Sequence, residues 1–210
     1  MRIERKFVFD NKFQLESCFK KLYKSFIFKK IYEPREISTI YLDTKNLDYL
    51  YDNLVGINNR IKARVRFYSN VNNKIIYEEK IKKNELGSKT KIILNLNGNK
   101  KISFESSLDK FKRTIFYLNS KSFLNETLFV KYKREYFSDM FGNFITIDKE
   151  IKFSDVTYFK KLISYNRSLI EYKIDENNYK KNMFYNFPQK YTRHSKYVVG
   201  MALLNKTSYV

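Results

Sequence analysis

The stretch Arg60-Ile61-Lys62-Ala63-Arg64-Val65-Arg66-Phe67 decides the fold, because basic and apolar side chains alternate along its whole length. Alternation with a period of two is typical of a β-strand, whose successive side chains point to opposite faces. The four basic side chains therefore share one face, and the apolar ones share the other. Neighbouring cations repel one another unless an anion or interleaved acids lie opposite them. The stretch thus indicates either a site for an anion or an ordinary solvated face.

Strand-like segments dominate the rest of the chain. We expect strands over residues 2–9, 37–42, 59–68, 74–83, 89–96, 101–106, 128–137, 143–148 and 168–175. Helices are expected over residues 13–27, 45–54, 107–124 and about 195–204. Neighbouring strands in this order favour antiparallel pairing, and eight strands suffice to close a barrel. We therefore expect a mainly β (α+β) protein, with residues 1–210 forming a single antiparallel eight-stranded β-barrel tunnel with peripheral helices.

The composition favours a polyanionic partner. The 210 residues carry 42 Lys and Arg against 22 Asp and Glu, a formal net charge of +20, and 43% of them are apolar, enough for a folded core. The single cysteine, Cys18, excludes a disulfide framework and a multi-cysteine zinc site, and we expect it in the core. The single histidine, His194, excludes a histidine-rich metal centre. Since no signal peptide or long apolar run is found, we expect a cytoplasmic protein.

Acids accompany bases at a fixed spacing. The triplet Glu-x-Lys occurs inside three expected strands, at Glu4/Lys6, Glu78/Lys80 and Glu171/Lys173. Residues two apart on a strand lie about 7 Å from each other on one face. Such a pair forms either a simple ion pair or a shared site, in which the carboxylate holds a divalent cation and the bases hold phosphate oxygens. If the sheet curls, these faces converge on one anion site; the pattern alone leaves both alternatives open.

Short blocks along almost the whole chain, from residue 2 to about residue 201, carry a resemblance to a known family. They are Arg2-x-Glu4-x-Lys6, Tyr41-Leu42-Asp43-Thr44, Lys62-Ala63-Arg64-Val65-Arg66-Phe67-Tyr68, Glu78-Glu79-Lys80, Tyr132-Lys133-Arg134, Ile145-Thr146-Ile147-Asp148, Ile170-Glu171-Tyr172-Lys173 and Ser195-Lys196-Tyr197. In this order and spacing they resemble the VTC domain, the polyphosphate polymerase branch of the triphosphate tunnel metalloenzymes (the CYTH-like superfamily).

The resemblance implies an antiparallel β tunnel lined with basic residues and a few glutamates. Its polymerase members use Mn²⁺ or Mg²⁺ to transfer the terminal phosphate of a nucleoside triphosphate, here expected to be ATP, to a polyphosphate chain. It implies a catalytic role for Arg64, Arg66, Lys80, Arg134 and Lys196. Substrate binding is assigned to Lys6 by resemblance, and to Lys62, Lys82, Lys89, Lys91 and Lys173 because they continue the basic alternation. The implied metal ligands are Glu171 first, then Glu4 and Glu78.

The chain also departs from the family pattern. Phe144 stands where members usually carry Arg, which would weaken binding of the chain substrate. The first strand has Arg2 where the triphosphatase and cyclase relatives have a glutamate, so it offers one acid fewer for activating water through a second metal. This difference favours a polymerase over a hydrolase. The family's membrane-channel segments are absent, so coupled translocation would need a membrane protein partner, with this chain at the inner face of the membrane.

Two other functions fit part of the pattern. The first is a tunnel-type inorganic triphosphatase, nucleotide phosphohydrolase or cyclase. The second is a non-catalytic protein that binds polyphosphate or nucleic acid, using its many Tyr and Phe side chains to stack on bases. A nucleic-acid surface does not need acids paired with bases on the same strand faces, so we expect no nucleic-acid partner.

Overall fold

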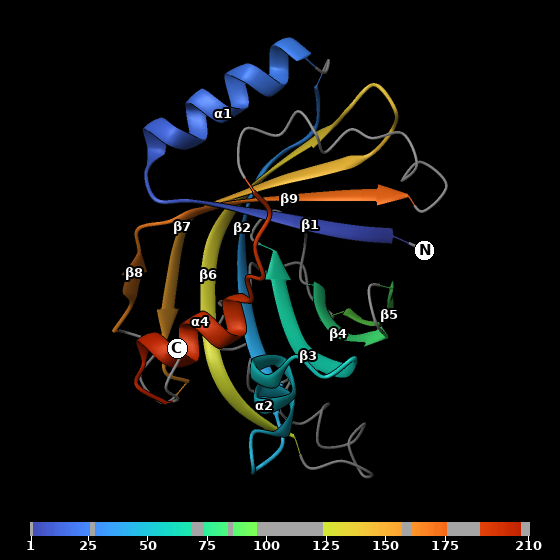
Figure 1. The fold of residues 1–210 in the computed structure, drawn as a ribbon. Helices are drawn as coiled ribbons and strands as arrows, with labels where there is room; N and C mark the ends of the chain where they lie inside the picture. The colour runs from blue at the N-terminus through green and yellow to red at the C-terminus, as the bar shows by residue number, and fades with distance from the viewer. Residues whose placement is uncertain are drawn as a thin grey trace.

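A single curled antiparallel sheet dominates the structure, a computed structural model that describes residues 2–25, 28–68, 74–83, 86–95, 124–156, 161–175 and 190–206 (Figure 1). The strands are β1 (Arg2–Phe9), β2 (Lys29–Asp43), β3 (Asn59–Tyr68), β4 (Lys74–Lys83), β5 (Leu86–Asn95), β6 (Asn125–Ser138), β7 (Phe144–Ser154), β8 (Ile163–Tyr165) and β9 (Ser168–Asp175). The helices are α1 (Lys12–Ser25), α2 (Asp48–Val55) and α4 (Lys196–Leu203).

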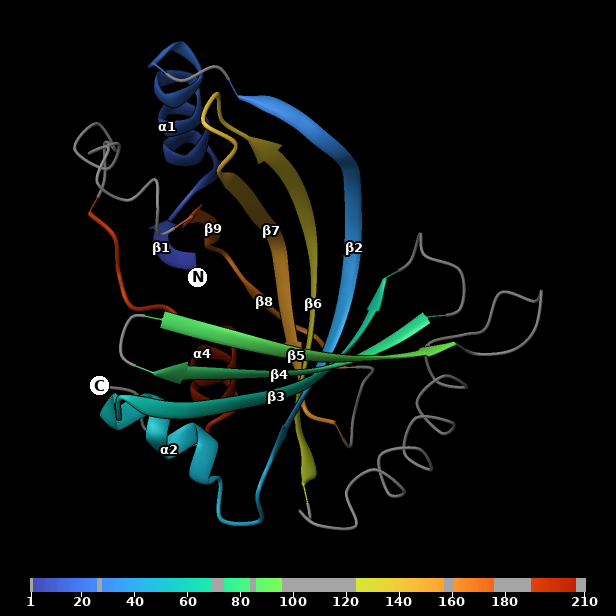
Figure 2. The ribbon, with the colours of Figure 1, turned by 90° about the vertical axis from the view of Figure 1, so that its right-hand side faces the viewer.

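The strand order explains the curl. It runs β1-β9-β7-β6-β2-β3-β4-β5, with β8 attached to β7. The long strand β2 pairs with β6 on one side and β3 on the other, and Figure 2 shows β3, β4 and β5 crossing in front of β6 and β7. The edge strands β1 and β5 come within 8 Å between Cα atoms. No ladder joins them within the described part of the chain, so the expected antiparallel β architecture is confirmed and the closed barrel is not.

The alternating stretch that opened the sequence analysis forms strand β3 with the expected bounds. The expected strands over 74–83 and 168–175 also match β4 and β9, and each expected helix in the described ranges is present with its ends shifted by up to three residues. The expected strand over 101–106 and helix over 107–124 lie outside the described residues. The short strand β8 was not expected.

Strand β2 begins eight residues earlier than expected. Its first half is mostly polar and exposed and contains Pro34, so no regular alternation marks it as a strand. Its pairing with β6 shifts register between Lys30 and Tyr32 and again between Tyr32 and Arg35. Such irregularities are typical of bulged strands, and they accommodate the proline that a regular ladder excludes.

Strand β7 extends six residues beyond the expected end because of a bulge. Glu150 adopts φ 51°, and the pairing with β6 slips by one residue around it. The slip reverses which residues point inward, so Asp148 and then Ile151 and Phe153 face the inside. A pattern search with a fixed period of two stops at this reversal.

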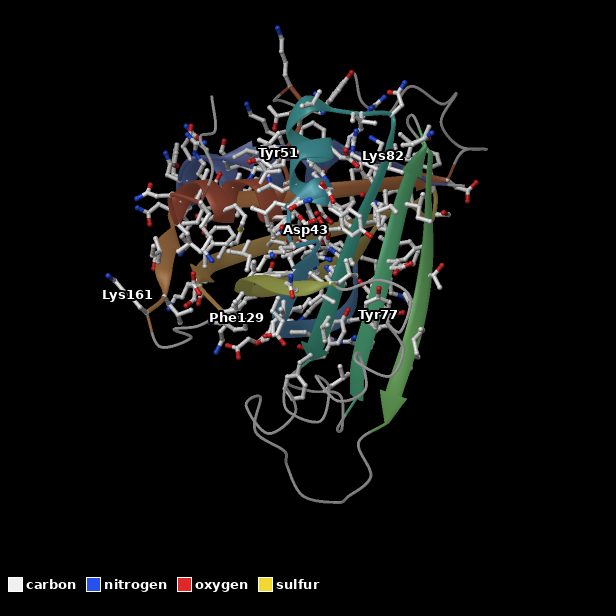
Figure 3. The ribbon with its side chains drawn as sticks, turned by 90° about the horizontal axis from the view of Figure 1, so that it is seen from below. Asp43, Tyr51, Tyr77, Lys82, Phe129 and Lys161 are labelled. Atoms are coloured by element: carbon white, nitrogen blue, oxygen red, sulfur yellow. The ribbon has the colours of Figure 1, made fainter. Side chains whose placement is uncertain are left out.

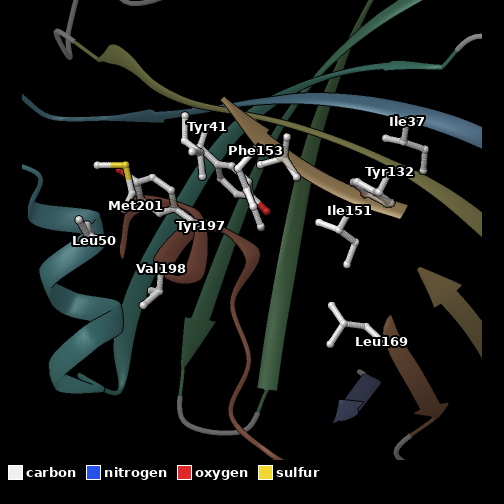
Figure 4. Close-up of a cluster of buried hydrophobic side chains, with 12 residues drawn as sticks. Ile37, Tyr41, Leu50, Tyr132, Ile151, Phe153, Leu169, Tyr197, Val198 and Met201 are labelled. Atoms are coloured by element: carbon white, nitrogen blue, oxygen red, sulfur yellow. The ribbon is translucent and has the colours of Figure 1, made fainter. Parts of the chain in front are cut away.

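Three apolar clusters hold the sheet. Helix α1 covers β1, β9 and β7 through a cluster that includes Leu15 and Cys18, which confirms that the cysteine lies in the core. A second cluster links Ile40, Ala63 and Tyr77 of β2, β3 and β4. The third lies between α4 and the inner face of β6 and β7, and it is drawn in Figure 4.

Helix α4 packs against α2 and against the inner face of β6 and β7. Tyr197 stacks on Tyr41 with ring centroids 4.9 Å apart, and its hydroxyl donates to Asp43, which also accepts from the N-terminal backbone of α2. Gly200 lies so close to Leu128 and Phe153 that a Cβ atom would fall within 2.5 Å of both side chains. The close approach fixes Lys196, one turn earlier, against the charged part of the inner face. Among the described helices, none has the length and apolarity needed to cross a membrane.

Candidate functional site

The curl of the sheet brings the basic faces of several strands toward one another around a charged interior. In Figure 3 many nitrogen and oxygen tips gather between β1 and β9 on one side and β3, β4 and β5 on the other, whereas Lys161 projects outward. The register places Lys62 opposite Lys80, and Arg64 opposite Glu78. Glu78 and Lys80 lie in turn opposite Lys91 and Lys89 of β5. The alternation predicted from sequence therefore does converge, and the solvated-face alternative does not describe these strands.

One side of this space, which we call the β7 wall, consists of Arg134, Asp148, Glu171 and Lys196. Asp148 is fully buried, and Arg134 reaches its two carboxylate oxygens at 2.5 and 2.6 Å. Lys196 of α4 donates to the same carboxylate at 2.5 Å. Burial alone would raise the pKa of Asp148, but these two cations hold it below its ordinary value. The wall is thus a dense network in which every charge faces an opposite one.

Glu171 extends the network toward β1. Its carboxylate lies 3.3 Å from Arg134, 3.7 Å from Lys196, 3.6 Å from Lys6 and 3.5 Å from Lys173. Burial opposes ionisation, but the surrounding cations keep the pKa of Glu171 well below its ordinary value. Burial also lowers the pKa of Lys173 to about 8, although Glu171 opposes this shift. Glu171 is therefore a charged carboxylate surrounded by four of the predicted site residues.

The opposite side, which we call the β3 wall, consists of Lys62, Arg64, Arg66, Glu78, Lys80 and Lys89. Its central acid is Glu78, which is almost completely buried. Arg64 and Arg66 contact this carboxylate at 2.9 and 3.3 Å, and Lys89 donates to it as well. Burial would raise the pKa of Glu78, yet the three cations hold it far below its ordinary value. Burial and the two arginines lower the pKa of Lys89 to about 7.

An ion pair crosses the gap between the edge strand β1 and strand β4, the neighbour of the other edge strand. Glu4 of β1 reaches Lys80 of β4 at 2.7 Å. Burial opposes ionisation of Glu4, but chiefly Lys80 lowers its pKa, to about 2. An ion pair therefore closes the charged space on the side where the sheet stays open.

Lys62 is the cation of the β3 wall with no carboxylate beside it among the described residues. Its ammonium donates to the hydroxyl of Ser195, just before α4, at 2.9 Å. Burial, and then the charges of Lys6, Lys80, Arg60 and Arg64, lower the pKa of Lys62 well below its ordinary value. Strand position and surrounding charge together mark Lys62 as a residue suited to contact an anion.

Two predicted binding residues lie toward the rim. Lys82 is partly buried opposite Arg60, and Lys91 is exposed opposite Glu78. The roles assigned to them from sequence stay predictions. All other predicted site residues line the β7 wall, the β3 wall or the β1 and β9 surface between them.

Two further residues belong to the site, although no role was predicted for them. Asp148 anchors Arg134 and Lys196. Tyr132 accepts a hydrogen bond from Arg66 at 3.2 Å, and its ring lies 4.9 Å from the ammonium of Lys196. Tyr132 shares a strand face with Arg134, so the two-residue alternation could have assigned it, whereas β7 carries no predicted base that would have marked Asp148.

Among the three predicted metal ligands, only Glu171 and Glu4 are suited to hold a divalent ion together. The described residues hold no group of three or more His, Cys, Asp or Glu side chains suited to a metal. Glu4 and Glu171 lie near enough for the charge of Glu171 to raise the pKa of Glu4. Mg²⁺ commonly takes one or two carboxylates and completes its shell with substrate phosphates and water. Glu171 and Glu4 fit an ion of this kind; Glu78 fits it poorly, because Arg64, Arg66 and Lys89 already occupy its oxygens.

Comparison with known proteins agrees with this architecture. The structure of the PH1819 protein from Pyrococcus horikoshii OT3 superposes with a TM-score of 0.54 at 17% identity, covering 99% of this chain and 100% of that one. A putative adenylate cyclase from Vibrio parahaemolyticus gives a TM-score of 0.55 at 13% identity, covering 93% of this chain and 95% of that one. No curated protein matches the sequence. The family model of the VTC domain matches residues 1–205, nearly the whole chain. This chain belongs to the VTC domain family.

Proposed function

We propose that this protein is a metal-dependent phosphotransferase that works as a polyphosphate polymerase. It would transfer the terminal phosphate of a nucleoside triphosphate, with ATP as the expected donor, to a polyphosphate chain lying along the curled sheet. The observation that carries the proposal is the β3 wall, where Arg64, Arg66 and Lys89 converge on the single carboxylate of Glu78. Membership of the VTC domain family supports the same substrate class.

The chemistry requires little more than position and charge. Phosphoryl transfer passes through a transition state whose negative charge spreads over the non-bridging oxygens, and fixed cations facing those oxygens stabilise it. Arg64, Arg66 and Lys80 supply such cations from neighbouring strands. The attacking terminal oxygen of a polyphosphate chain is already ionised at neutral pH, so no side chain has to remove a proton from it. This explains how the reaction would proceed without a catalytic His, Cys or Ser.

The β7 wall would position the donor. Asp148 fixes Arg134 and Lys196 in place, so both cations would meet the triphosphate without losing side-chain freedom at that moment. Lys6 and Lys173 flank Glu171 and would contact the same phosphates. A divalent ion held by Glu171 and Glu4 would neutralise charge that develops on the phosphate oxygens.

The arrangement of acids favours transfer to a phosphate chain over hydrolysis. Activation of water by two metals needs more free carboxylate oxygens than Glu4 and Glu171 offer, and Glu78 is occupied by three cations. The arrangement of bases also disfavours a nucleic-acid surface. Several exterior lysines form ion pairs of their own, such as Lys131 with Glu36 and Lys149 with Glu135.

The test is synthesis of polymer by the purified protein. Incubation with ATP and Mn²⁺, or with Mg²⁺, is expected to yield chains of phosphate that are resolved by gel electrophoresis. Glu171→Ala and Arg64→Ala are expected to abolish synthesis, whereas the exterior variant Lys133→Ala serves as the matched control. Circular dichroism confirms that each variant is folded.

Other products would identify another enzyme or a binding protein. Release of orthophosphate from tripolyphosphate, with no polymer under any nucleotide or metal, would replace the polymerase by a triphosphatase. Strong binding of DNA or RNA that falls steeply with salt, with no phosphate chemistry, would support a binding protein instead. For a polymerase, export of the polymer would call for a membrane protein partner, which co-purification from membranes tests.

A further inference from the structure

Lys62 of β3 contacts Ser195, the residue just before α4. Lys62 Nζ lies 2.9 Å from Ser195 Oγ, so the amine has a neutral hydroxyl as its hydrogen-bond partner. Lys80 lies directly opposite it on β4, Arg60 and Arg64 share its face of β3, and Lys6 of β1 adds a further repelling charge. The carboxylates of the neighbouring strands serve other cations, since Glu4 pairs with Lys80 and Glu78 with Arg64.

This geometry disfavours a proton on Lys62 in the free protein. Partial burial removes water from the ammonium group, and four surrounding cations repel its charge. A polyanion placed between these cations offsets their repulsion, because each phosphate charge stabilises the ammonium form of Lys62. A hydroxyl partner is compatible with both forms, since it accepts from an ammonium group and donates to a neutral amine.

We propose that binding of a phosphate chain or triphosphate brings one proton to Lys62, so that anion binding at this site is coupled to proton uptake. The proposal rests on the proposed function, because it assumes that the enclosed site receives a polyphosphate. It adds that Lys62 carries less positive charge before the ligand binds than an ordinary lysine does, and that the ligand restores this charge.

Linkage then fixes the direction of the pH dependence. If binding takes up a proton, the ligand binds more tightly at lower pH, by up to tenfold in Kd for each pH unit. The effect extends from the free-site pKa of Lys62 upward to that of the complex. Lys89 and Lys173, whose pKa values are about 7 and 8, also gain protons when an anion binds. Only a comparison that changes Lys62 alone isolates its contribution.

The experiment is calorimetric titration of the full chain with tripolyphosphate at about pH 8, in buffers of different ionisation enthalpy, which yields the number of protons taken up. Wild type is compared with Lys62→Arg, which keeps the positive charge but does not titrate. The exterior variant Lys133→Arg is the matched control. We expect wild type and the control to take up more protons than Lys62→Arg, by at most about one. We also expect the Kd of Lys62→Arg to vary less with pH.

The outcomes separate the inference from the function on which it rests. Equal proton uptake by wild type and Lys62→Arg, with tripolyphosphate bound by both, would overturn the inference and leave the proposed function intact. Absence of tripolyphosphate binding by wild type would overturn both. If Lys62→Arg does not fold, Lys62→Met replaces it, and the same difference in proton number is expected.

Discussion

The two walls of the charged interior consist of similar residue types but differ in their balance of charge. On the β7 wall, Asp148 and Glu171 match Arg134 and Lys196 one for one, and Asp148 is completely buried. On the β3 wall, three cations (Arg64, Arg66 and Lys89) share the carboxylate of Glu78, and Lys62 has only a hydroxyl beside it. A balanced buried network can hold a fold together, whereas an excess of one charge costs stability until a ligand neutralises it. The difference indicates that the β7 wall is mainly a scaffold and the β3 wall mainly a receptor.

The largest expected effect comes from breaking the balance of the β7 wall. Asp148→Asn leaves Arg134 and Lys196 buried without their shared carboxylate, and removal of one partner from a buried pair typically costs about 3–5 kcal/mol. We expect a loss of that size in the free energy of unfolding, measured by urea denaturation. Glu33→Gln, which breaks an exposed pair with Lys30, is the matched control. A loss below about 1 kcal/mol would show that the β7 wall is not a scaffold.

The β3 wall was predictable from sequence, and the β7 wall was only partly so. Strand β3 alternates without interruption, so its bounds and its basic face follow directly from the period of two. The β7 wall depends on Lys196, which a helix brings in from a distant part of the sequence, and on a carboxylate whose strand reverses phase at Glu150. The alternation of residues within a strand predicts neither the position of Lys196 nor the phase reversal at Glu150.

Whether the sheet closes into a barrel could not be predicted from local sequence patterns either. Counting strands predicts a barrel, but whether β1 and β5 pair depends on twist summed over the whole sheet. The structure instead brings Glu4 and Lys80 together across the gap. Phe144, which replaces the usual Arg of the family, lies opposite Lys173 at the start of β7. The sequence identified that substitution, but only the register locates it next to the charged site.

A smaller effect is expected from substitution of Glu78, the acid of the β3 wall. It should lower the free energy of unfolding but strengthen the binding of tripolyphosphate. Glu78→Gln removes the charge that Arg64, Arg66 and Lys89 share, so unfolding should become easier by about 1–2 kcal/mol. The same change frees three cations, and we expect tripolyphosphate to bind about tenfold more tightly. Calorimetry and denaturation measure the two effects.

The same variant sharpens the assignment of metal ligands. If Glu78 only balances charge, metal dependence of the activity stays the same in Glu78→Gln. Weaker binding of tripolyphosphate together with a raised requirement for Mn²⁺ would instead make Glu78 a metal ligand, and the β3 wall would then be more than a receptor for anions.

Lys62→Met should raise stability, by about 1 kcal/mol near pH 7, because it removes a cation that its neighbours repel. The sign follows from linkage. The folded-state pKa of Lys62 lies below its unfolded value, so the unfolded chain binds more protons between the two values and wild-type stability rises with pH there. The advantage of the variant is therefore largest at the low-pH end and shrinks toward about pH 10. Thermal denaturation from about pH 7 to pH 9 measures this trend; an advantage that grows with pH would contradict the charge argument.

The smallest effect is expected on the outside of the sheet. Lys133 pairs with Glu150 at 2.8 Å, but both side chains are more than half exposed, and water and salt screen such a pair. Lys133→Ala should therefore leave the melting temperature and tripolyphosphate affinity within experimental error of wild type. Lys133 is adjacent in sequence to Arg134 and carries the same formal charge, yet it points to the opposite face of β6. A clear loss of affinity in this variant would mean that ligand binding extends to the exterior of the sheet, and the contrast between the two inner walls would no longer describe where the anion binds.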